Sequence, residues 1–85
     1  MQEKEVGKVS HFFGKISVGI IKLTDSLKVG DTVHIKGAHS DFTQKVESMQ
    51  VEHKVLESGD AGDEVGIKVA EKVHEHDTVY KVIEE

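Results

Sequence analysis

The identity of the apolar residues is the sequence feature that most limits the fold. Thirteen Val and six Ile stand against only three Leu and three Ala. β-Branched side chains are restricted at χ1 and pack well on a pleated surface, whereas a helical domain normally relies on Leu and Ala. The apolar composition therefore predicts a chain built from strands.

The alternation of apolar and polar residues supports this interpretation. Val65, Ile67 and Val69, for example, occupy every second position of one segment, as expected for a half-buried strand. The phase of the alternation changes between Ile20 and Ile21, which predicts a bulge there or a strand covered on both faces. Together these patterns predict six strands, over residues 4–12, 15–23, 32–37, 43–52, 64–70 and 78–84.

The connections between the expected strands are short and turn-like. Gly30 precedes the third strand, Gly37 follows it, and both Gly59 and Gly62 precede the fifth strand. Short strands separated by turns of this kind are typical of a small, closed or nearly closed antiparallel barrel. Closure would also hide the edges of a Val-rich sheet. We therefore expect an all-β fold, a small six-stranded antiparallel β-barrel.

The length of 85 residues predicts a single domain over residues 1–85. The chain has no Cys, so a disulfide framework and a thiolate metal site are excluded. No run reaches the roughly 18 apolar residues that a membrane span needs. The first residues are polar, unlike a secretory signal peptide. These features together predict a cytoplasmic protein with no membrane contact.

The charge of the chain argues against nucleic acid as its main partner. All eleven positive side chains are Lys, against sixteen Asp and Glu. Lys neutralises phosphate but lacks the planar fork of Arg. Tight binding to a nucleic-acid backbone depends on clustered cations. RNA binding is therefore a weak alternative, and a protein partner is the stronger expectation.

Four segments, in this order and at these spacings, carry a resemblance to a known family. They are Val6-Gly7-Lys8-Val9, Leu27 to Gly37, Val46-Glu47-Ser48-Met49-Gln50 and Gly62 to Val69. Together they resemble the second domain of translational GTPases such as elongation factor Tu. The resemblance covers nearly the whole chain, from about Glu5 to Val82, and it implies a six-stranded β-barrel.

In that family the barrel packs against a GTP-binding domain and, in elongation factor Tu, contributes to the pocket for the 3′ end of aminoacyl-tRNA. The segment Ser48 to His53 is similar to the strand that leads into this pocket. The hairpin His11 to Lys15 is similar to a family loop that often carries Arg, but Phe12 and Phe13 stand in its place here. The resemblance therefore implies the fold more strongly than the tRNA-binding role.

Two segments supply the candidate partner-binding residues. Adjacent residues of a strand face opposite sides, so one of the paired phenylalanines can fill the barrel while the other contacts a partner, unless the hairpin turns both inward. The predicted partner-binding residues are His11, Phe12, Phe13 and Lys15 in the hairpin, and Met49, Gln50 and His53 in the second segment.

Catalytic, nucleotide and metal sites are weakly indicated. The stretch from Gly7 to Gly14-Lys15-Ile16 lacks the spacing and the Ser or Thr of a phosphate loop, so we expect no GTP binding by this chain alone. His74 and His76 could share a metal with a neighbouring carboxylate, but this stretch also fits a polar turn. Acids and bases occur without a nucleophile motif. We therefore expect no catalytic residue, no metal and no cofactor.

The sequence thus predicts a non-enzymatic, translation elongation factor-like module that binds a translation-related protein or RNA. The alternative is an accessory subunit, or the equivalent of an appended domain, of an enzyme outside translation. The partner's identity and the oligomeric state are left open by the sequence.

Overall fold

The computed structural model describes residues 2–51 and 54–83, and this part of the chain is built from strands and turns without a helix. All-β architecture is therefore confirmed. The ten strands are β1 (Gln2–Phe13), β2 (Val18–Leu23), β3 (Leu27–Lys28), β4 (Thr32–Lys36), β5 (Asp41–Lys45), β6 (Met49–Val51), β7 (Lys54–Leu56), β8 (Ser58–Gly59), β9 (Glu64–Lys68) and β10 (Thr78–Ile83).

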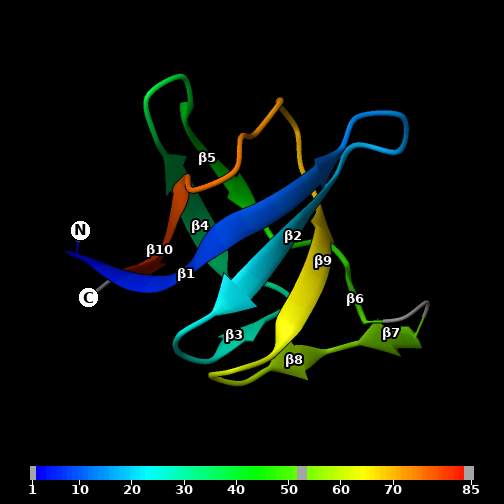
Figure 1. Ribbon diagram of the computed structural model, residues 1–85. Coiled ribbons are helices and arrows are strands. Elements are labelled where there is room, and N and C mark those ends of the chain that lie inside the picture. Colours follow the sequence, from blue (N-terminus) through cyan, green and yellow to red (C-terminus); the bar gives the residue numbers. More distant parts are fainter. Residues whose placement is uncertain (1, 52–53, 84–85) are drawn as a thin grey trace.

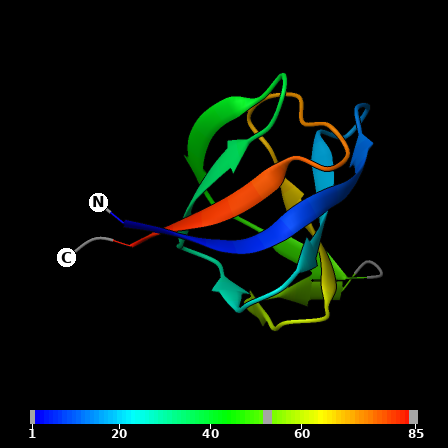
Figure 2. The same ribbon diagram turned by 60° about the vertical axis from the view of Figure 1, so that its left-hand side comes forward.

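Eight of these strands form one curved antiparallel sheet in the order β5-β4-β10-β1-β2-β9-β6-β7, and β3 pairs separately with β8 (Figures 1 and 2). The prediction of a closed six-stranded barrel is wrong in both closure and strand number. The sheet curls around the core, but β5 and β7 remain as its two edges. The additional strands β3, β7 and β8 lie in or beside segments with turn signals. Each is too short to show an alternation of apolar and polar residues.

The gap in the sheet arises where the predicted strand 43–52 divides into β5 and β6. The N–H of Val46 donates to the carbonyl of Asp31 at 2.8 Å, and the carbonyl of Val46 accepts from the N–H of Gly30 at 2.8 Å. These bonds hold Val46 beside the turn before β4. Three residues later, Met49 pairs with Ile67 of β9. The chain thus leaves one strand pair and joins another, so the ladder is interrupted between β5 and β9.

The core lies on the concave side of the sheet and consists mainly of Val and Ile, as the composition predicts. Phe12, Phe42, Val51 and Leu56 are partly buried and pack against it. Its fully enclosed apolar side chains are Val6, Val9, Ile21, Leu23, Leu27, Val33, Ile35, Val46, Met49, Val65, Ile67, Val69, Val73 and Val79.

The bulge that the sequence predicts near Ile20 lies in the opposite strand. The register of β1 against β2 shifts between Val9, which pairs with Ile21, and His11, which pairs with Ile20. The extra residue is Ser10 of β1, while β2 pairs regularly with β9. Because a bulge reverses which residues face the core, His11 points outward although Val9, two residues earlier, is buried.

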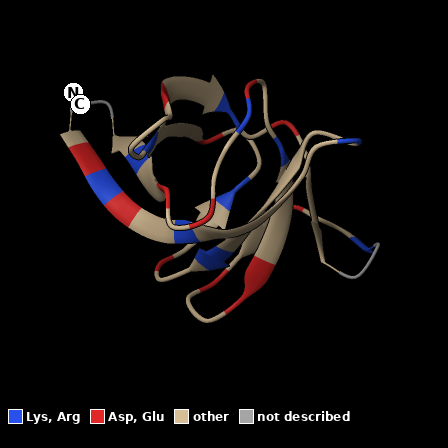
Figure 3. Cartoon of the chain, turned by 45° about the horizontal axis from the view of Figure 1, so that its top comes forward, with Lys and Arg blue, Asp and Glu red and all other residues tan. Residues whose placement is uncertain are grey.

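The two ends of the described chain lie side by side, because Gln2 of β1 pairs with Ile83 of β10 (Figures 1 and 2). The turn between β1 and β2 lies at the other end of β1. Lys residues and acidic residues are interspersed along the chain, and at the start of β1 they alternate (Figure 3). None of the described segments is a helix long and apolar enough to cross a membrane.

Candidate interaction surface

The two phenylalanines of the β1–β2 hairpin face opposite sides of the sheet. Phe12 pairs with Gly19 and packs against the core, whereas Phe13 pairs with Val18 and is 50% exposed. Gly19 lies on the core side, where an added Cβ would lie 3.2 Å from Cγ2 of Val73 and 3.5 Å from Cγ1 of Val69. The alternation expected at this pair is therefore present, and Phe13 is the member that a partner can reach.

A cross-strand row on the convex side extends this surface over five neighbouring strands. His11 pairs with Ile20, Ile20 with Gly66, Gly66 with Gln50, and Gln50 with Val55. Paired residues of an antiparallel ladder project to the same face. The row therefore places distant segments of the sequence on one surface.

We call this surface the outer face and define it by His11, Phe13, Val18, Ile20, Gln50 and Val55, with Gly66 at its centre. Val55 is 76% exposed, and the rings of His11 and Phe13 stack with centroids 6.4 Å apart. The side chains of Ile20 and Val18 cover Gly66, because a Cβ there would lie 3.2 Å from each of them. The outer face is thus apolar at both ends and at its centre.

The structure separates the predicted partner-binding residues into accessible and inaccessible ones. His11, Phe13, Lys15 and Gln50 are exposed, but Met49 is fully buried against β9 and is not available to a partner. His53 lies outside the described residues. His11 and Gln50 stand in the same row but three strand spacings apart, roughly 14 Å. The two predicted segments therefore share the outer face without touching each other.

Charged groups border the outer face. Nδ1 of His11 lies 3.5 Å from a carboxylate oxygen of Glu75, and both side chains are more than half exposed. Lys15 lies in the turn after Phe13, beside Ile16, which is 60% exposed. The tip of the hairpin therefore combines two exposed apolar side chains with one lysine.

His34 lies away from the outer face and links three strands. Its Nδ1 is 2.9 Å from a carboxylate oxygen of Glu3 on β1, and its Nε2 is 2.5 Å from Oδ1 of Asp41 on β5. The hydrogen bond with Asp41 raises the pKa of His34 above its ordinary value, and Glu3 acts in the same direction. His34 therefore stabilises the strand arrangement most when it is protonated.

The histidines considered as metal ligands do not face one another. His74 is half-buried, and its ring Nδ1 lies 3.3 Å from Oγ of Ser40. The backbone N–H of His74 donates to Oδ2 of the buried Asp77 at 2.9 Å. His76 is exposed in the turn before β10, with a positive φ of 74°. Over residues 2–51 and 54–83, no group of three or more His, Cys, Asp or Glu side chains is arranged to hold a metal ion.

The glycine-lysine sequence compared with a phosphate loop forms the β1–β2 turn. Gly14, Lys15 and Ile16 connect two antiparallel strands, and the N–H of Ile16 donates to the carbonyl of Phe13 at 3.3 Å. A phosphate loop instead leads from a strand into a helix. This segment therefore has the geometry of a hairpin turn.

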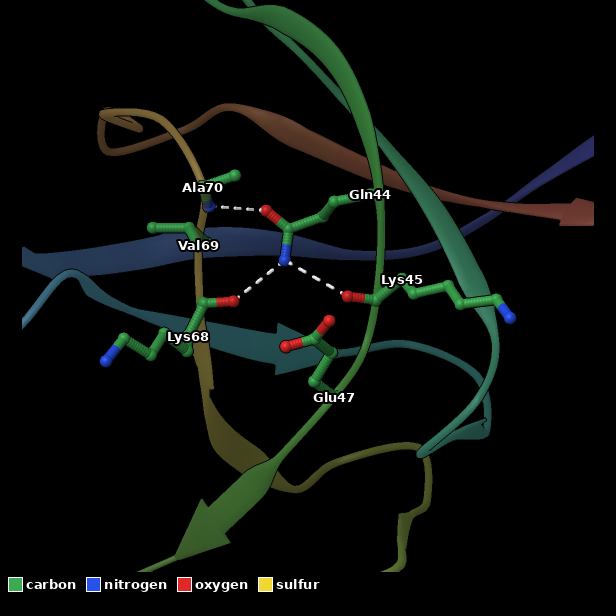
Figure 4. Close-up of a pocket in the computed structure, with 6 residues that line it drawn as sticks. All are labelled: Gln44, Lys45, Glu47, Lys68, Val69 and Ala70. Atoms are coloured by element: carbon green, nitrogen blue, oxygen red, sulfur yellow. Dashed lines mark hydrogen bonds between the residues drawn. The ribbon is translucent and has the colours of Figure 1, made fainter.

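The second region singled out by the structure is the junction between β5 and the end of β9, which we call the seam. Here the side-chain amide of Gln44 on β5 donates to the carbonyl of Lys68 at 2.7 Å and accepts from the N–H of Ala70 at 2.7 Å. These contacts join the two parts of the sheet where the backbone ladder is absent (Figure 4).

Sequence reasoning missed Val18, Ile20 and Val55 of the outer face, and it missed Gln44 at the seam. The outer face depends on which strands pair and in which register, and the Ser10 bulge changes that register. Gln44 occupies an ordinary position of an alternating strand. In the predicted second strand, Val18 and Ile20 alternate on the opposite face to Ile21 and Leu23. This second apolar face was the signal that could have revealed part of the surface.

Comparison with known proteins relates the chain to proteases. A stretch of 77 residues is 42% identical to an uncharacterized protease of Methanocaldococcus jannaschii, covering 89% of this chain but 19% of that protease. Over 82 residues the chain is 30% identical to a collagenase of Porphyromonas gingivalis, covering 94% of this chain and 23% of the collagenase. The chain thus spans about a fifth of the length of these relatives. No protein-family model matches it.

Solved structures show the same arrangement of strands. The C-terminal domain of a putative U32 peptidase from Geobacillus thermoleovorans superimposes with a TM-score of 0.88 at 19% identity, over 94% of this chain and 93% of that domain. Its selenomethionine variant gives a TM-score of 0.86 over 89% of this chain. The fold is that of a peptidase C-terminal domain.

These findings correct the predicted relationship to translational GTPases and, with it, the predicted translation role. The relatives found by sequence and by structure are proteases or parts of them. The segments that carried the resemblance, such as Lys28-Val29-Gly30-Asp31 followed by an alternating strand, are turn chemistry that small antiparallel sheets share. The alternative of a domain appended to an enzyme outside translation agrees better with these relatives.

Proposed function

We propose that the chain is a non-catalytic domain of a larger peptidase-like protein, and that its outer face binds polypeptide. The observation that carries this proposal is the 42% identity to a protease of which the chain spans only 19%. A segment that matches one part of a protease along 89% of its own length behaves as a separate module of that enzyme.

The composition of the outer face supports a polypeptide ligand. Exposed aromatic side chains are frequent anchors at protein interfaces, and Phe13 is such a side chain, half-exposed and stacked on His11. Val55 supplies a second apolar contact at the other end of the row. An apolar row in which Gln50 is a polar member between Gly66 and Val55 matches a chain that presents apolar residues at intervals.

The position of the hairpin supports contact with something other than directly adjoining sequence. Gln2 and Ile83 pair at one end of β1, and Phe13 ends the same strand 11 residues later. β1 therefore carries the paired chain ends and the hairpin at its opposite ends, in a molecule whose longest dimension is 33 Å. Any sequence attached before β1 or after β10 would begin at the end of β1 remote from Phe13.

Denatured collagen is a suitable probe, since one relative is a collagenase. We expect the purified chain to leave gelatin uncleaved but to be retained on a gelatin column. Phe13→Ser should weaken retention about tenfold or more, because interface aromatics commonly contribute over 1 kcal/mol.

Val29→Ser is the matched control, because Val29 is 37% exposed but lies in the turn before β4 and is not one of the residues of the outer face. This control should be retained as well as the wild type. Cleavage of gelatin by the chain alone, or equal retention of Phe13→Ser and wild type, would contradict the proposal.

A further inference from the structure

The backbone of β9 ends in hydrogen-bonding groups that face the seam and not another strand. The N–H of Val69 donates across to the carbonyl of Ser17 in the hairpin turn at 2.8 Å. In an extended chain, successive backbone groups point to opposite sides. The carbonyl of Lys68 and the N–H of Ala70 therefore point away from the hairpin, toward β5.

These two groups are occupied by one side-chain amide. Gln44 donates from Nε2 to the Lys68 carbonyl and accepts at Oε1 from the Ala70 N–H, both at 2.7 Å, and Nε2 also lies 3.3 Å from the carbonyl of Lys45. Figure 4 shows the amide between the two backbones. A neighbouring strand in a sheet would satisfy the same carbonyl and the same N–H. The side chain of Gln44 thus takes the place of a peptide group.

The seam also has room and a free strand beside it. A depression of about 280 Å³ is lined by Gln44, Lys45, Glu47, Lys68, Val69 and Ala70. β5 is an edge strand of the eight-stranded sheet, with β4 as its single partner. A segment laid along β5 would therefore reach the Lys68 carbonyl and the Ala70 N–H once the Gln44 side chain rotates away.

We propose that the seam is an acceptor site for an extended polypeptide segment, which adds to the free edge of β5 and displaces the Gln44 amide from Lys68 and Ala70. Strand addition of this kind takes its affinity from main-chain hydrogen bonds. Gln44 acts as an internal competitor that occupies the Lys68 carbonyl and the Ala70 N–H while the site is empty. The proposal concerns the chain alone and does not depend on its relationship to proteases.

Amide hydrogen exchange of Ala70 tests this site. The probe is a short capped peptide of alternating threonine and valine with one central glutamate for solubility. In Gln44→Ala we expect faster exchange of the Ala70 N–H, restored protection on addition of the peptide, and roughly tenfold tighter peptide binding than in the wild type, because the competing hydrogen bonds are gone. A version of the peptide with proline at alternate positions lacks the N–H donors and should give no protection.

Gln2→Ala is the matched control, since Gln2 is an exposed glutamine at the start of β1, outside both the seam and the outer face, and it should bind the probe as the wild type does. If Gln44→Ala fails to fold, the side-chain NH₂ resonances of Gln44 in the wild type decide the question, because displacement by the peptide must shift them. Absence of peptide protection at Ala70 and of any Gln44 shift would overturn the proposal. Equal binding of the proline peptide would overturn it as well.

Discussion

Replacing Gly37 by alanine is expected to destabilise the fold severely. Gly37 follows β4, and its N–H donates to the carbonyl of Ser40 at 2.7 Å. A Cβ added at Gly37 would overlap Oδ1 of Asp77, lie 2.6 Å from its Cγ and lie 3.3 Å from its Cα. Asp77 is only 3% exposed, so the carboxylate has little free space to enter.

The loss of stability in Gly37→Ala can be estimated from the hydrogen bonds that Asp77 makes. Its Oδ2 accepts from the N–H of His74 at 2.9 Å, and its carbonyl accepts from the N–H of Val9 at 2.8 Å. Rotation of the carboxylate would leave the His74 N–H unsatisfied, at about 1–3 kcal/mol. Overpacking adds about 1–3 kcal/mol. We expect a total loss of about 2–6 kcal/mol and a fall in Tm of about 10 °C or more.

Urea unfolding followed by circular dichroism measures this loss, with Gly14→Ala as the matched control. A Cβ at Gly14 would lie 3.6 Å from its nearest neighbour, Cε2 of Phe12, which is ordinary contact, so we expect a change below about 1 kcal/mol. In an Asp77→Ala background, Gly37→Ala should cost at least about 1 kcal/mol less than in the wild type. A Gly37→Ala variant as stable as the wild type, or an equal cost in both backgrounds, would refute the reasoning.

Two further predictions concern the hairpin and His34. Phe12→Ala should lower the free energy of unfolding by about 2–4 kcal/mol and Phe13→Ala by less than about 1 kcal/mol, because only Phe12 of the two packs against the core. Urea unfolding of both variants measures these losses. Equal losses would disprove the assignment of the two side chains to opposite faces. The folded-state pKa of His34 is raised above 6.5, so its contribution to stability is complete below that value and is lost as the pH rises through the folded pKa. Urea midpoints at about pH 5.5 and about pH 8.5 should therefore show a decrease in the wild type that is smaller in His34→Gln, and an identical pH dependence of the two proteins would contradict the pairing with Glu3 and Asp41.

The sequence predicted the class of the fold because the class depends on local residue chemistry. β-Branched composition and alternation are properties of each strand alone, and β4 and β9 lie close to their predicted ranges, 32–37 and 64–70. Closure depends on contacts between distant segments. Val46 bonds with Asp31 and Gly30, and in the sequence this interruption of strand 43–52 leaves only a change of apolar phase between Val46 and Met49.

The candidate surface was predictable only in part, for a similar reason. The exposure of Phe13 follows from the opposite faces of adjacent strand residues, but the partnership of His11 with Gln50 and Val55 requires the order of five strands. Met49 and its neighbour Gln50 occupy opposite faces of β6, one buried and one exposed. A register error of one residue in the prediction exchanges their faces. Predicting the seam from the sequence would require knowing that the Gln44 amide contacts Lys68, 24 residues later at the end of β9.

The central claim, that the outer face of a non-catalytic domain binds polypeptide, is tested most directly by nuclear magnetic resonance. The measurement is a titration of the isotope-labelled chain with a soluble denatured-collagen fragment. We expect the amide signals of His11, Phe13, Gln50 and Val55 to shift together with one dissociation constant, while the signal of Val29 stays in place. Absence of any shift at saturating fragment, or shifts that leave these four residues unchanged, would contradict it.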